Sequence, residues 1–315
     1  MEDLTGEKEI MAWKKNPEGE NQYYYKPNRA KTTMIQKDRL KEQKYKPGEF
    51  PPQFFENVEE KLTPIRRGYW AYAIDGDGCV NKEGKRIKVV IPLKDREPIQ
   101  QLADIYGSSI SFIEYPEENW EPTYKTSLHG KRALHFLRLI CPYMTEKRKK
   151  ATEYINIFDP SYHPPKISMN FKQNPNLINP HIGMVAGFFD TEGSVGIRTR
   201  EKKHMTKKFG ERIYTSLDPW LDFSNTNTRP LRKIKKILET PPFHFDSVIR
   251  VKRRGNLKKN GDQCDTCYAL IISQHQHLLF MKMFSPWILI TRKREYADKF
   301  ERKKQIYEMC KNDLE

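Results

Sequence analysis

The hydrophobic and polar positions of residues 61–315 follow the same order twice. Each repeat opens with a proline, Pro64 or Pro180, followed by an apolar stretch of helical length. Proline suits the first position of a helix because the N–H that it lacks has no partner there. The two stretches end in "WAYAIDGDG" and "VAGFFDTEG", whose last acids, Asp77 and Glu192, lie 115 positions apart. The pattern predicts two equivalent buried helices, each ending at a carboxylate.

Alternating and helical segments follow each acid in the same order. The predicted strands span residues 79–82, 86–93, 109–115 and 123–128 in the first repeat, and 194–200, 212–225, 247–253 and 268–273 in the second. This order predicts an α+β fold of two tandem, pseudo-symmetric αββαββα units. We divide the chain into an N-terminal extension of uncertain structure (1–60), a first half (61–158), a proline-rich linker (159–178) and a second half (179–315).

Small residues occur at helical spacing in both opening helices. Such a stripe lets two helix backbones approach closely, so the two helices are expected to pack side by side. Tyr72 occupies the place that Gly187 has in the second helix and is expected to widen this seam. Gly78 and Gly193 follow the acids and suit the left-handed turn that ends many helices. The predicted seam residues are Gly68, Ala71, Gly183, Ala186 and Gly187.

Composition narrows the choice of partner. The chain has a formal charge of +16, and residues 1–60 hold 11 basic and 12 acidic residues, so the basic surplus lies in the two repeats. Such a surplus indicates a polyanionic partner, because Lys and Arg displace counterions from phosphates. A mean hydropathy of −0.84 and the lack of a long apolar run predict no membrane span.

The cysteines and the N-terminus indicate where the chain works. The N-terminus has no apolar signal core, which predicts an intracellular protein. Five scattered cysteines indicate free thiols in a reducing compartment. Cys264 and Cys267 form a single C-x-x-C without a second pair, which argues against a zinc site.

An acid at the C-terminal end of a helix is unfavourable, because that end carries the negative pole of the backbone dipole. Two such acids brought together form a poor protein environment but a good site for a hard divalent cation. Mg²⁺ or Mn²⁺ takes oxygen ligands from carboxylates and from substrate phosphates. The pattern therefore predicts metal-assisted hydrolysis of a phosphodiester.

Both stretches resemble the LAGLIDADG motif of homing endonucleases. The first matches at Ala71, Ile74, Asp75, Asp77 and Gly78, and the second at Ala186, Gly187, Asp190 and Gly193, with Glu192 in place of Asp. The resemblance implies a single-chain, monomeric enzyme whose antiparallel sheets form a saddle over double-stranded DNA. It further implies a double-strand break in a long asymmetric site, with Mg²⁺ as cofactor.

The resemblance also implies roles for particular residues. Asp77 and Glu192 would be the catalytic, metal-binding acids, joined at the metal by Gly76 and Thr191. Lys131 would support the attacking water, whereas His275 stands at the aligned place in the second half. Asn225 matches a polar position before the second helix of its half, where the first half has Leu93. The expected DNA-binding residues are Lys82, Lys85, Arg86, Lys88, Arg198, Arg200, Lys202, Lys203, Arg250 and Lys252.

Two alternatives stay open at this level. Some chains with this motif act as RNA maturases for their host intron, and others bind DNA without cutting it. Asp75 and Asp190 are interpreted as structural residues that orient the turn, rather than as metal ligands. The basic runs "KRKK" and "RKRE" are expected to contact phosphate or solvent.

Overall fold

The computed structural model describes most of the two repeats. The described residues are 50–51, 53–84, 86–114, 122–206, 210–253 and 265–296, with residues 299 and 302 and the strand segments 14–15, 21–22 and 32–34. For residues 199–217 this description covers the backbone only. Lys85 lies outside it, and so do the side chains of Arg200, Lys202 and Lys203, so these four predictions are untested.

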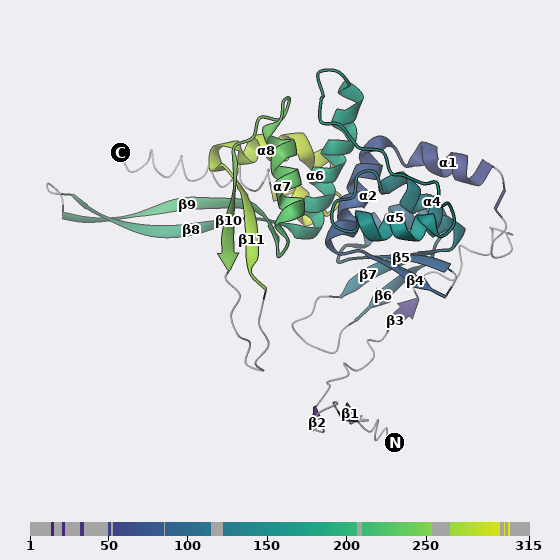
Figure 1. The fold of residues 1–315 in the computed structure, drawn as a ribbon. Helices are drawn as coiled ribbons and strands as arrows, with labels where there is room; N and C mark the ends of the chain where they lie inside the picture. Colours follow the sequence, from purple (N-terminus) through teal and green to yellow (C-terminus); the bar gives the residue numbers. More distant parts are fainter. Residues whose placement is uncertain are drawn as a thin grey trace.

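The two halves have the same order of elements (Figure 1). The first comprises α2 (Pro64–Gly76), β4 (Cys79–Glu83), β5 (Arg86–Leu93), α3 (Arg96–Tyr106), β6 (Ile110–Ile113), β7 (Thr123–His129), α4 (Lys131–Ile140) and α5 (Arg148–Asn156). The second comprises α6 (Ile178–Glu192), β8 (Gly193–Thr206), β9 (Gly210–Asn225), α7 (Thr228–Glu239), β10 (Ser247–Arg253), β11 (Cys267–Ile272), α8 (His277–Phe284) and α9 (Thr291–Arg294). Short 3-10 turns, η2 (Pro175–Leu177), η3 (Gln274–Gln276) and η4 (Ser285–Trp287), precede α6, precede α8 and follow α8, respectively.

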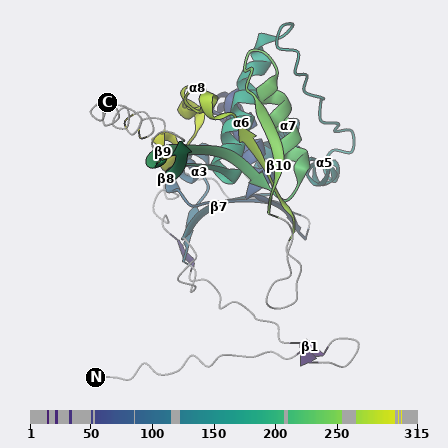
Figure 2. The same cartoon turned by 90° about the vertical axis from the view of Figure 1, so that its left-hand side faces the viewer.

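Each half contributes one antiparallel sheet. The strand orders are β3-β6-β7-β5-β4 in the first half and β10-β11-β9-β8 in the second. Their registers are equivalent, because Cys79 pairs with Val90 as Ser194 pairs with Asp222. The helices of both halves lie on one side of the sheets, which leaves the other side open (Figure 2). The predicted α+β fold with two antiparallel sheets is confirmed.

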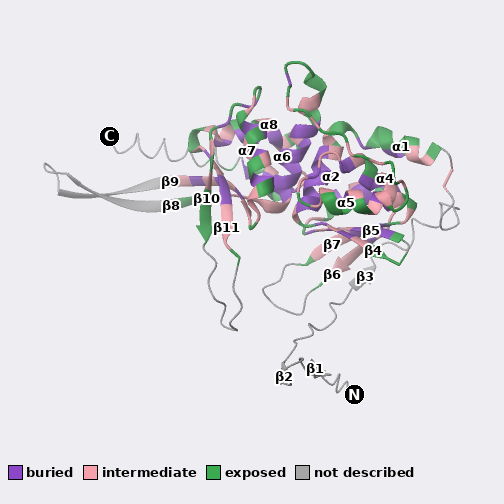
Figure 3. Cartoon of the chain, in the orientation of Figure 1, coloured by how far each residue is buried: buried purple, intermediate pink, exposed green. Residues whose placement is uncertain are grey.

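One face of each sheet forms the core with the helices. In β5, Ile87, Val89 and Ile91 are buried while the residues between them are partly exposed. In β9, Leu221 and Phe223 are buried in the same way. This alternation is expected for a sheet with one packed face and one open face. The centres of α2 and α6 are buried on all sides (Figure 3).

The helices α2 and α6 pack side by side, as the small residues predict. A Cβ atom added at Gly183 would collide with the carbonyl oxygen of Ile65, and one at Gly68 with that of Pro180. Gly187 lies against the backbone of Tyr69 in the same way. These glycines are therefore needed for the close approach of the two backbones.

Tyr72 fits beside this seam without preventing the contact. Its buried ring meets Phe188 edge-to-face at 5.5 Å, and its hydroxyl lies 2.7 Å from Thr145 Oγ1. The ring is thus accommodated between the helix and the segment that follows α4. The expected widening at Tyr72 does not separate the helices at Gly187.

Gly78 and Gly193 do not form the left-handed turns predicted for them. Neither adopts a positive φ, and Gly193 has an extended backbone with φ of −78°. A Cβ at Gly78 would lie 2.6 Å from the Cα of Ile74, and one at Gly193 would collide with the ring and carbonyl of Phe189. Both glycines allow the chain to fold back tightly against the helix that it leaves.

The N-terminal extension contributes to the first half. A helix, α1 (Gln53–Lys61), buries Val58 against the core, and β3 (Thr32–Met34) pairs with β6 as the edge strand of the five-stranded sheet. β1 (Lys14–Lys15) and β2 (Asn21–Gln22) form a short antiparallel pair. No helix in the part of the chain that the structure describes is long and apolar enough to cross a bilayer.

Candidate active site at the paired helix ends

The two predicted acids meet where α2 and α6 end. Asp77 is the C-terminal cap of α2, and Glu192 is the last residue of α6. A Cβ atom at Gly76 would lie 2.8 Å from the Cβ of Thr191 and 3.3 Å from Oε1 of Glu192. The helix ends therefore touch, and the absence of a side chain at Gly76 makes room for the Glu192 carboxylate. The structure brings together Asp77, Glu192, Gly76 and Thr191.

The electrostatics of the pair reflect this proximity. The pKa of Glu192 is raised to about 7, first by burial and next by the negative charges of Asp77 and Glu146. Partial desolvation also raises the pKa of Asp77, although its side chain is exposed and solvent screens much of the effect. An incompletely neutralised carboxylate pair of this kind binds a cation readily.

Two lysines that the sequence analysis did not single out occupy the helix ends. Lys147 Nζ donates hydrogen bonds to the carbonyl oxygens of Ile74, Asp75 and Gly76 at 2.6, 2.8 and 3.1 Å. An ammonium at the C-terminal end of a helix offsets the negative pole of its dipole and satisfies carbonyls that have no partner within the helix. The charge of Lys147 thus offsets part of the unfavourable interaction between Asp77 and the negative end of the α2 dipole.

Lys293 does the same for α6. Its Nζ donates to the carbonyl oxygens of Phe189, Asp190 and Gly193 at 2.5, 2.8 and 2.7 Å. Burial lowers the pKa of this buried lysine to about 8, and the nearby carboxylates oppose the shift. The first lysine of "KRKK" and the lysine of "RKRE" thus bind the protein's own backbone, contrary to the expectation that these runs contact phosphate or solvent.

The lysines and the acids interact across the two halves. The largest favourable charge near Asp77 is that of Lys293, from the second half, followed by those of Lys147 and Lys94. The largest favourable charge near Glu192 is that of Lys147, from the first half. Each half therefore supplies a cation to the other half's acid, and the four residues form one cluster.

Asp75 and Asp190 fix the segment that carries each lysine. Asp75 accepts hydrogen bonds from the backbone N–H groups of Thr145, Glu146 and Lys147 at 2.5, 3.1 and 2.9 Å. Its side chain is buried, and burial raises its pKa against the lowering effect of these bonds. The carboxylate is fully engaged with the backbone, in agreement with the structural role expected for it.

Asp190 has the equivalent role in the second half. Its Oδ2 accepts from the N–H groups of Leu289 and Ile290 at 2.7 and 3.3 Å, and from the Tyr69 hydroxyl at 2.7 Å. Burial raises the pKa of Asp190 to about 6. The bond from Tyr69 ties the second half to the first at the helix seam.

The other two predicted catalytic residues, Lys131 and Asn225, come from the beginning of α4 and the end of β9. Lys131 is the exposed first residue of α4, and its support of the attacking water stays a prediction. His275, its counterpart, is exposed and lies 3.8 Å from Asp246 Oδ2. Asn225 ends β9, and its Oδ1 accepts the N–H of Asn227 at 2.7 Å, forming the turn before α7. The lysines that reach the acids are Lys147 and Lys293.

The open faces of the sheets carry several of the predicted DNA-binding side chains. On these faces Arg86, Arg198, Arg250 and Lys252 are exposed, and Lys88 is half-buried. Lys82 is also exposed, but it pairs with buried Ile87 and so belongs to the helix side of the sheet. Lys88 Nζ lies 2.7 Å from Glu83 Oε1, and Lys252 Nζ lies 3.1 Å from Asp222 Oδ1. The helix ends thus lie between two sheet faces whose charged groups are partly paired within the protein.

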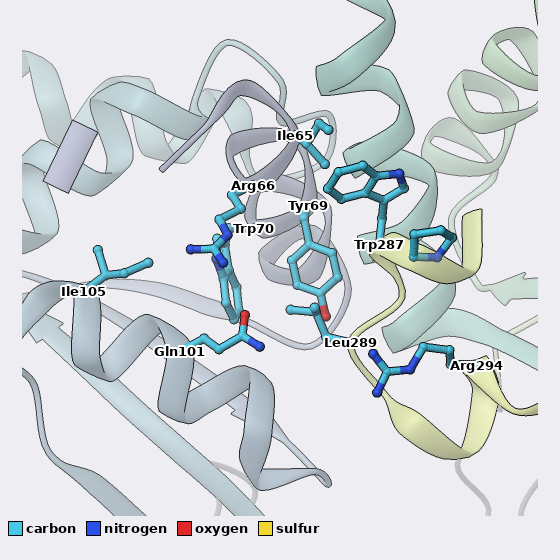
Figure 4. A pocket seen from close by; sticks show the side chains of 10 residues that line it. Ile65, Arg66, Tyr69, Trp70, Gln101, Ile105, Trp287, Leu289 and Arg294 are labelled. Atoms are coloured by element: carbon cyan, nitrogen blue, oxygen red, sulfur yellow. The ribbon is translucent and has the colours of Figure 1, made fainter. Parts of the chain in front are cut away.

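A separate crevice lies between the halves, near the beginning of α2 (Figure 4). Tyr69, Trp70 and Trp287 line it, with Arg66 and Arg294 at its rim. Because α2 rises about 1.5 Å per residue, Arg66 and Asp77 are roughly 16 Å apart along the helix. The acid cluster is therefore outside this crevice, at an open helix end that a long substrate can reach.

The chain resembles known proteins in its fold. No protein-family model matches the chain, and no curated protein matches its sequence. The solved structures similar to it are LAGLIDADG homing endonucleases.

Three of these structures illustrate the extent of the likeness. The LAGLIDADG meganuclease I-AabMI bound to uncleaved DNA is 13% identical, covering 78% of this chain and 92% of its own, with a TM-score of 0.45. The homing endonuclease I-WcaI bound to its DNA recognition sequence is 13% identical, covering 82% and 97%, with a TM-score of 0.41. The meganuclease I-SmaMI bound to uncleaveable DNA is 15% identical, covering 73% and 86%, with a TM-score of 0.35. At these values, function has to be inferred from the residues of this chain.

Proposed function

We infer that the chain is a site-specific DNA endonuclease that makes a double-strand break in a long asymmetric site by Mg²⁺-dependent phosphodiester hydrolysis. The observation that carries this proposal is the meeting of Asp77 and Glu192 at the ends of α2 and α6. Each acid comes from a different half, so one chain supplies both members of the pair. The enzyme would therefore act as a monomer on double-stranded DNA.

The residues at the helix ends fit a hard divalent cation. Two carboxylates and the nearby carbonyl oxygens are ligands that Mg²⁺ or Mn²⁺ prefers, and phosphate oxygens of a substrate would complete the shell. Among the described residues, no three His, Cys, Asp or Glu side chains gather at one place, so substrate oxygens would be needed. The Gly76 carbonyl already accepts a bond from Lys147, so it has one lone pair left for a cation.

The protein's own groups prepare this site. When bound, divalent cations would supply charge stabilisation for the scissile phosphate and for an attacking water. Lys147 and Lys293 oppose the rise in the pKa values of Asp77 and Glu192 that burial causes, and so favour the ionised, ligand-competent forms of the two acids. Because both ammonium groups are held by three carbonyl oxygens each, their positions are set before DNA arrives.

The open sheet faces would hold the DNA. The two sheets lie side by side below the helices, and both expose basic side chains on strands that follow the acids. Phosphate contacts by such side chains would position the duplex, and base contacts from the open faces would select its sequence. The two faces differ in sequence, which fits an asymmetric site.

Sequencing of broken DNA ends tests the proposal. The protein is incubated with a randomised double-stranded DNA library and Mg²⁺, and the ends produced are sequenced. We expect breaks at one extended sequence, with both strands cut. Asp77→Asn and Glu192→Gln should abolish breaks but retain DNA binding in EDTA, whereas Asp104→Asn on α3 serves as a matched carboxylate control. DNA binding without any breaks by the unaltered protein would contradict the endonuclease proposal.

A further inference from the structure

A tryptophan and an arginine form a fixed pair on the open face of the second sheet. The indole of Trp220, in β9, lies directly across Gly196, where an added Cβ would collide with the ring. Its Nε1–H donates to Ser194 Oγ at 3.2 Å, which holds the other side of the ring. The guanidinium carbon of Arg198 lies 4.7 Å from the centre of this ring. The Arg198 side chain is exposed, so its guanidinium remains accessible to solvent.

The location of the pair follows from the alternation of β9. Leu221 and Phe223 are buried, so Trp220 between Pro219 and Leu221 points to the opposite, open face. Gly196 pairs with Trp220, and Arg198 is two residues further along the same face of β8. Ser194, Trp220 and Arg198 therefore form one row that begins beside the end of α6.

We propose that Arg198 reads a guanine in the half of the DNA site that the second sheet binds, with Trp220 as the support that holds its guanidinium plane. This inference rests on the proposed function. A general basic contact would involve only phosphate, whereas here Arg198 contacts a base and Trp220 holds Arg198 in position. Trp220 is a positioning residue, since it acts through Arg198.

The chemistry of the guanidinium favours a base over a phosphate. Arginine presents a planar fork of donors that matches O6 and N7 of guanine in the major groove. Stacking on an aromatic ring keeps the fork in one plane and reduces the freedom lost on binding. An arginine that served only as a phosphate contact would need neither the indole nor the glycine beneath it.

Neighbouring side chains on the same face support a fixed reading surface. Lys252 Nζ donates to Asp222 Oδ1 and Oδ2 at 3.1 and 3.2 Å and to Ser224 Oγ at 2.6 Å. These bonds tie β10 to β9 and engage Asp222, which pairs with Ser194 at one end of the row. Asp218 pairs with Arg198 across β8 and β9, so the row carries an acid beside the exposed guanidinium as well as the indole that it stacks on.

The test is a binding selection from a randomised DNA library in EDTA, followed by sequencing, for the unaltered protein and for Arg198→Lys, Trp220→Leu and Arg250→Lys. Lysine keeps the charge of Arg198 but loses the fork. Arg250→Lys is the matched control, because Arg250 is an exposed arginine of the same sheet without an aromatic support. Thermal melting of each variant establishes that it is folded.

We expect the unaltered protein to enrich guanine at one position of the second half-site. Arg198→Lys should reduce that preference about tenfold or more while leaving other positions unchanged. Trp220→Leu should reduce the same preference at the same position, and Arg250→Lys should leave it intact. Equal weakening for all sequences by Arg198→Lys, or an unchanged preference for guanine, would overturn the inference while the enzyme still bound DNA. Failure of the unaltered protein to enrich any sequence would overturn the proposed function itself.

Discussion

The two halves are alike at the helix ends and different on the sheet faces. At the ends, Asp77 matches Glu192, Asp75 matches Asp190, and Lys147 matches Lys293 in the bonds that it makes. On the open faces, the positions equivalent to Gly196, Arg198 and Trp220 are Asn81, Glu83 and Lys88. The first half thus has an ion pair, Lys88–Glu83, where the second has an arginine stacked on an indole.

The difference shows which parts of the repeat are constrained. The helix ends must place charges symmetrically about the seam, because both acids and both lysines interact there. In the part of the chain that the structure describes, the halves contact each other mainly through α2 and α6, so the side chains on the open sheet faces can differ without disturbing the core. A duplicated scaffold of this kind can perform the same chemistry twice on two unlike stretches of substrate.

The largest effect is expected at the seam, where the halves are most alike. Gly183→Ala places a Cβ against the Ile65 carbonyl, and Gly68→Ala places one against the Pro180 carbonyl. Each should lower the free energy of unfolding by about 3 kcal/mol through overpacking. Urea unfolding of both variants measures this loss. A loss in only one of them would show that the seam is less symmetric than its glycines indicate.

Removal of a helix-end lysine should come next. Lys147→Met and Lys293→Met each leave three carbonyl oxygens without their donor and raise the pKa of both acids. We expect cleavage to fall on the order of a hundredfold in each variant, because fixed charge is lost beside the reacting phosphate.

Initial rates of DNA cleavage measure this effect. Lys131→Ala and His275→Ala serve as comparisons at exposed residues and should slow cleavage less than Lys147→Met does. A greater loss for Lys131→Ala than for Lys147→Met would restore the role first expected for Lys131.

Glu192 should make stability depend on pH in the absence of metal. Its pKa is raised from 4.5 to about 7 in the folded protein, so the folded state binds the proton more tightly than the unfolded state. Stability therefore falls as pH rises from about 4.5 to 7, and the loss persists above pH 7. Glu192→Gln should be more stable than the unaltered protein at pH 8 by about 1–2 kcal/mol, since partial exposure screens the charge.

Thermal melting in EDTA at pH 4.5 and pH 8 measures this difference. The advantage of Glu192→Gln should vanish at the lower pH. Asp77→Asn should give a smaller gain, because Asp77 is exposed. An equal advantage at both pH values would assign the effect to packing instead of to charge.

The smallest effect is expected for a single phosphate contact on the first sheet. Arg86 is exposed on the open face at the start of β5, and Arg86→Ala should weaken binding to all DNA sequences alike. The slope of log K against log salt should decrease by about one unit. Titration of DNA at several salt concentrations measures it. A change in sequence preference would instead make Arg86 a base contact, and the open face of the first sheet would then select bases as proposed for the second.

Much of the scaffold could be predicted from the sequence. The period of the apolar residues predicted α2 and α6, and the stripe of glycines predicted their contact. Pro64 is the first residue of α2 as expected, whereas α6 begins two residues before Pro180, because the 3-10 turn η2 leads directly into it. The strands β5 and β10 span the predicted residues. These features are local or depend on spacing along one element, which a sequence displays directly.

The remaining features depend on contacts between distant segments. Lys147 and Lys293 stand at different spacings from Pro142 and Pro286, so alignment on the prolines did not reveal that the two lysines are equivalent. Each lies inside a basic run whose composition indicates surface. The roles of Gly78 and Trp220 likewise depend on what faces them, and α1 was hidden in a polar extension. The sequence signal that could have indicated the two lysines is that each half has a lysine shortly after its third helix, α4 or α8.

The linker between the halves affects how often Asp77 and Glu192 meet. Because Asp77 and Glu192 belong to one polypeptide, their encounter is intramolecular and its effective concentration is fixed by the tether. Dilution cannot separate them, so each molecule of the proposed endonuclease carries the complete acid pair. Activity per molecule should accordingly hold constant at protein concentrations where a two-subunit enzyme would fall apart.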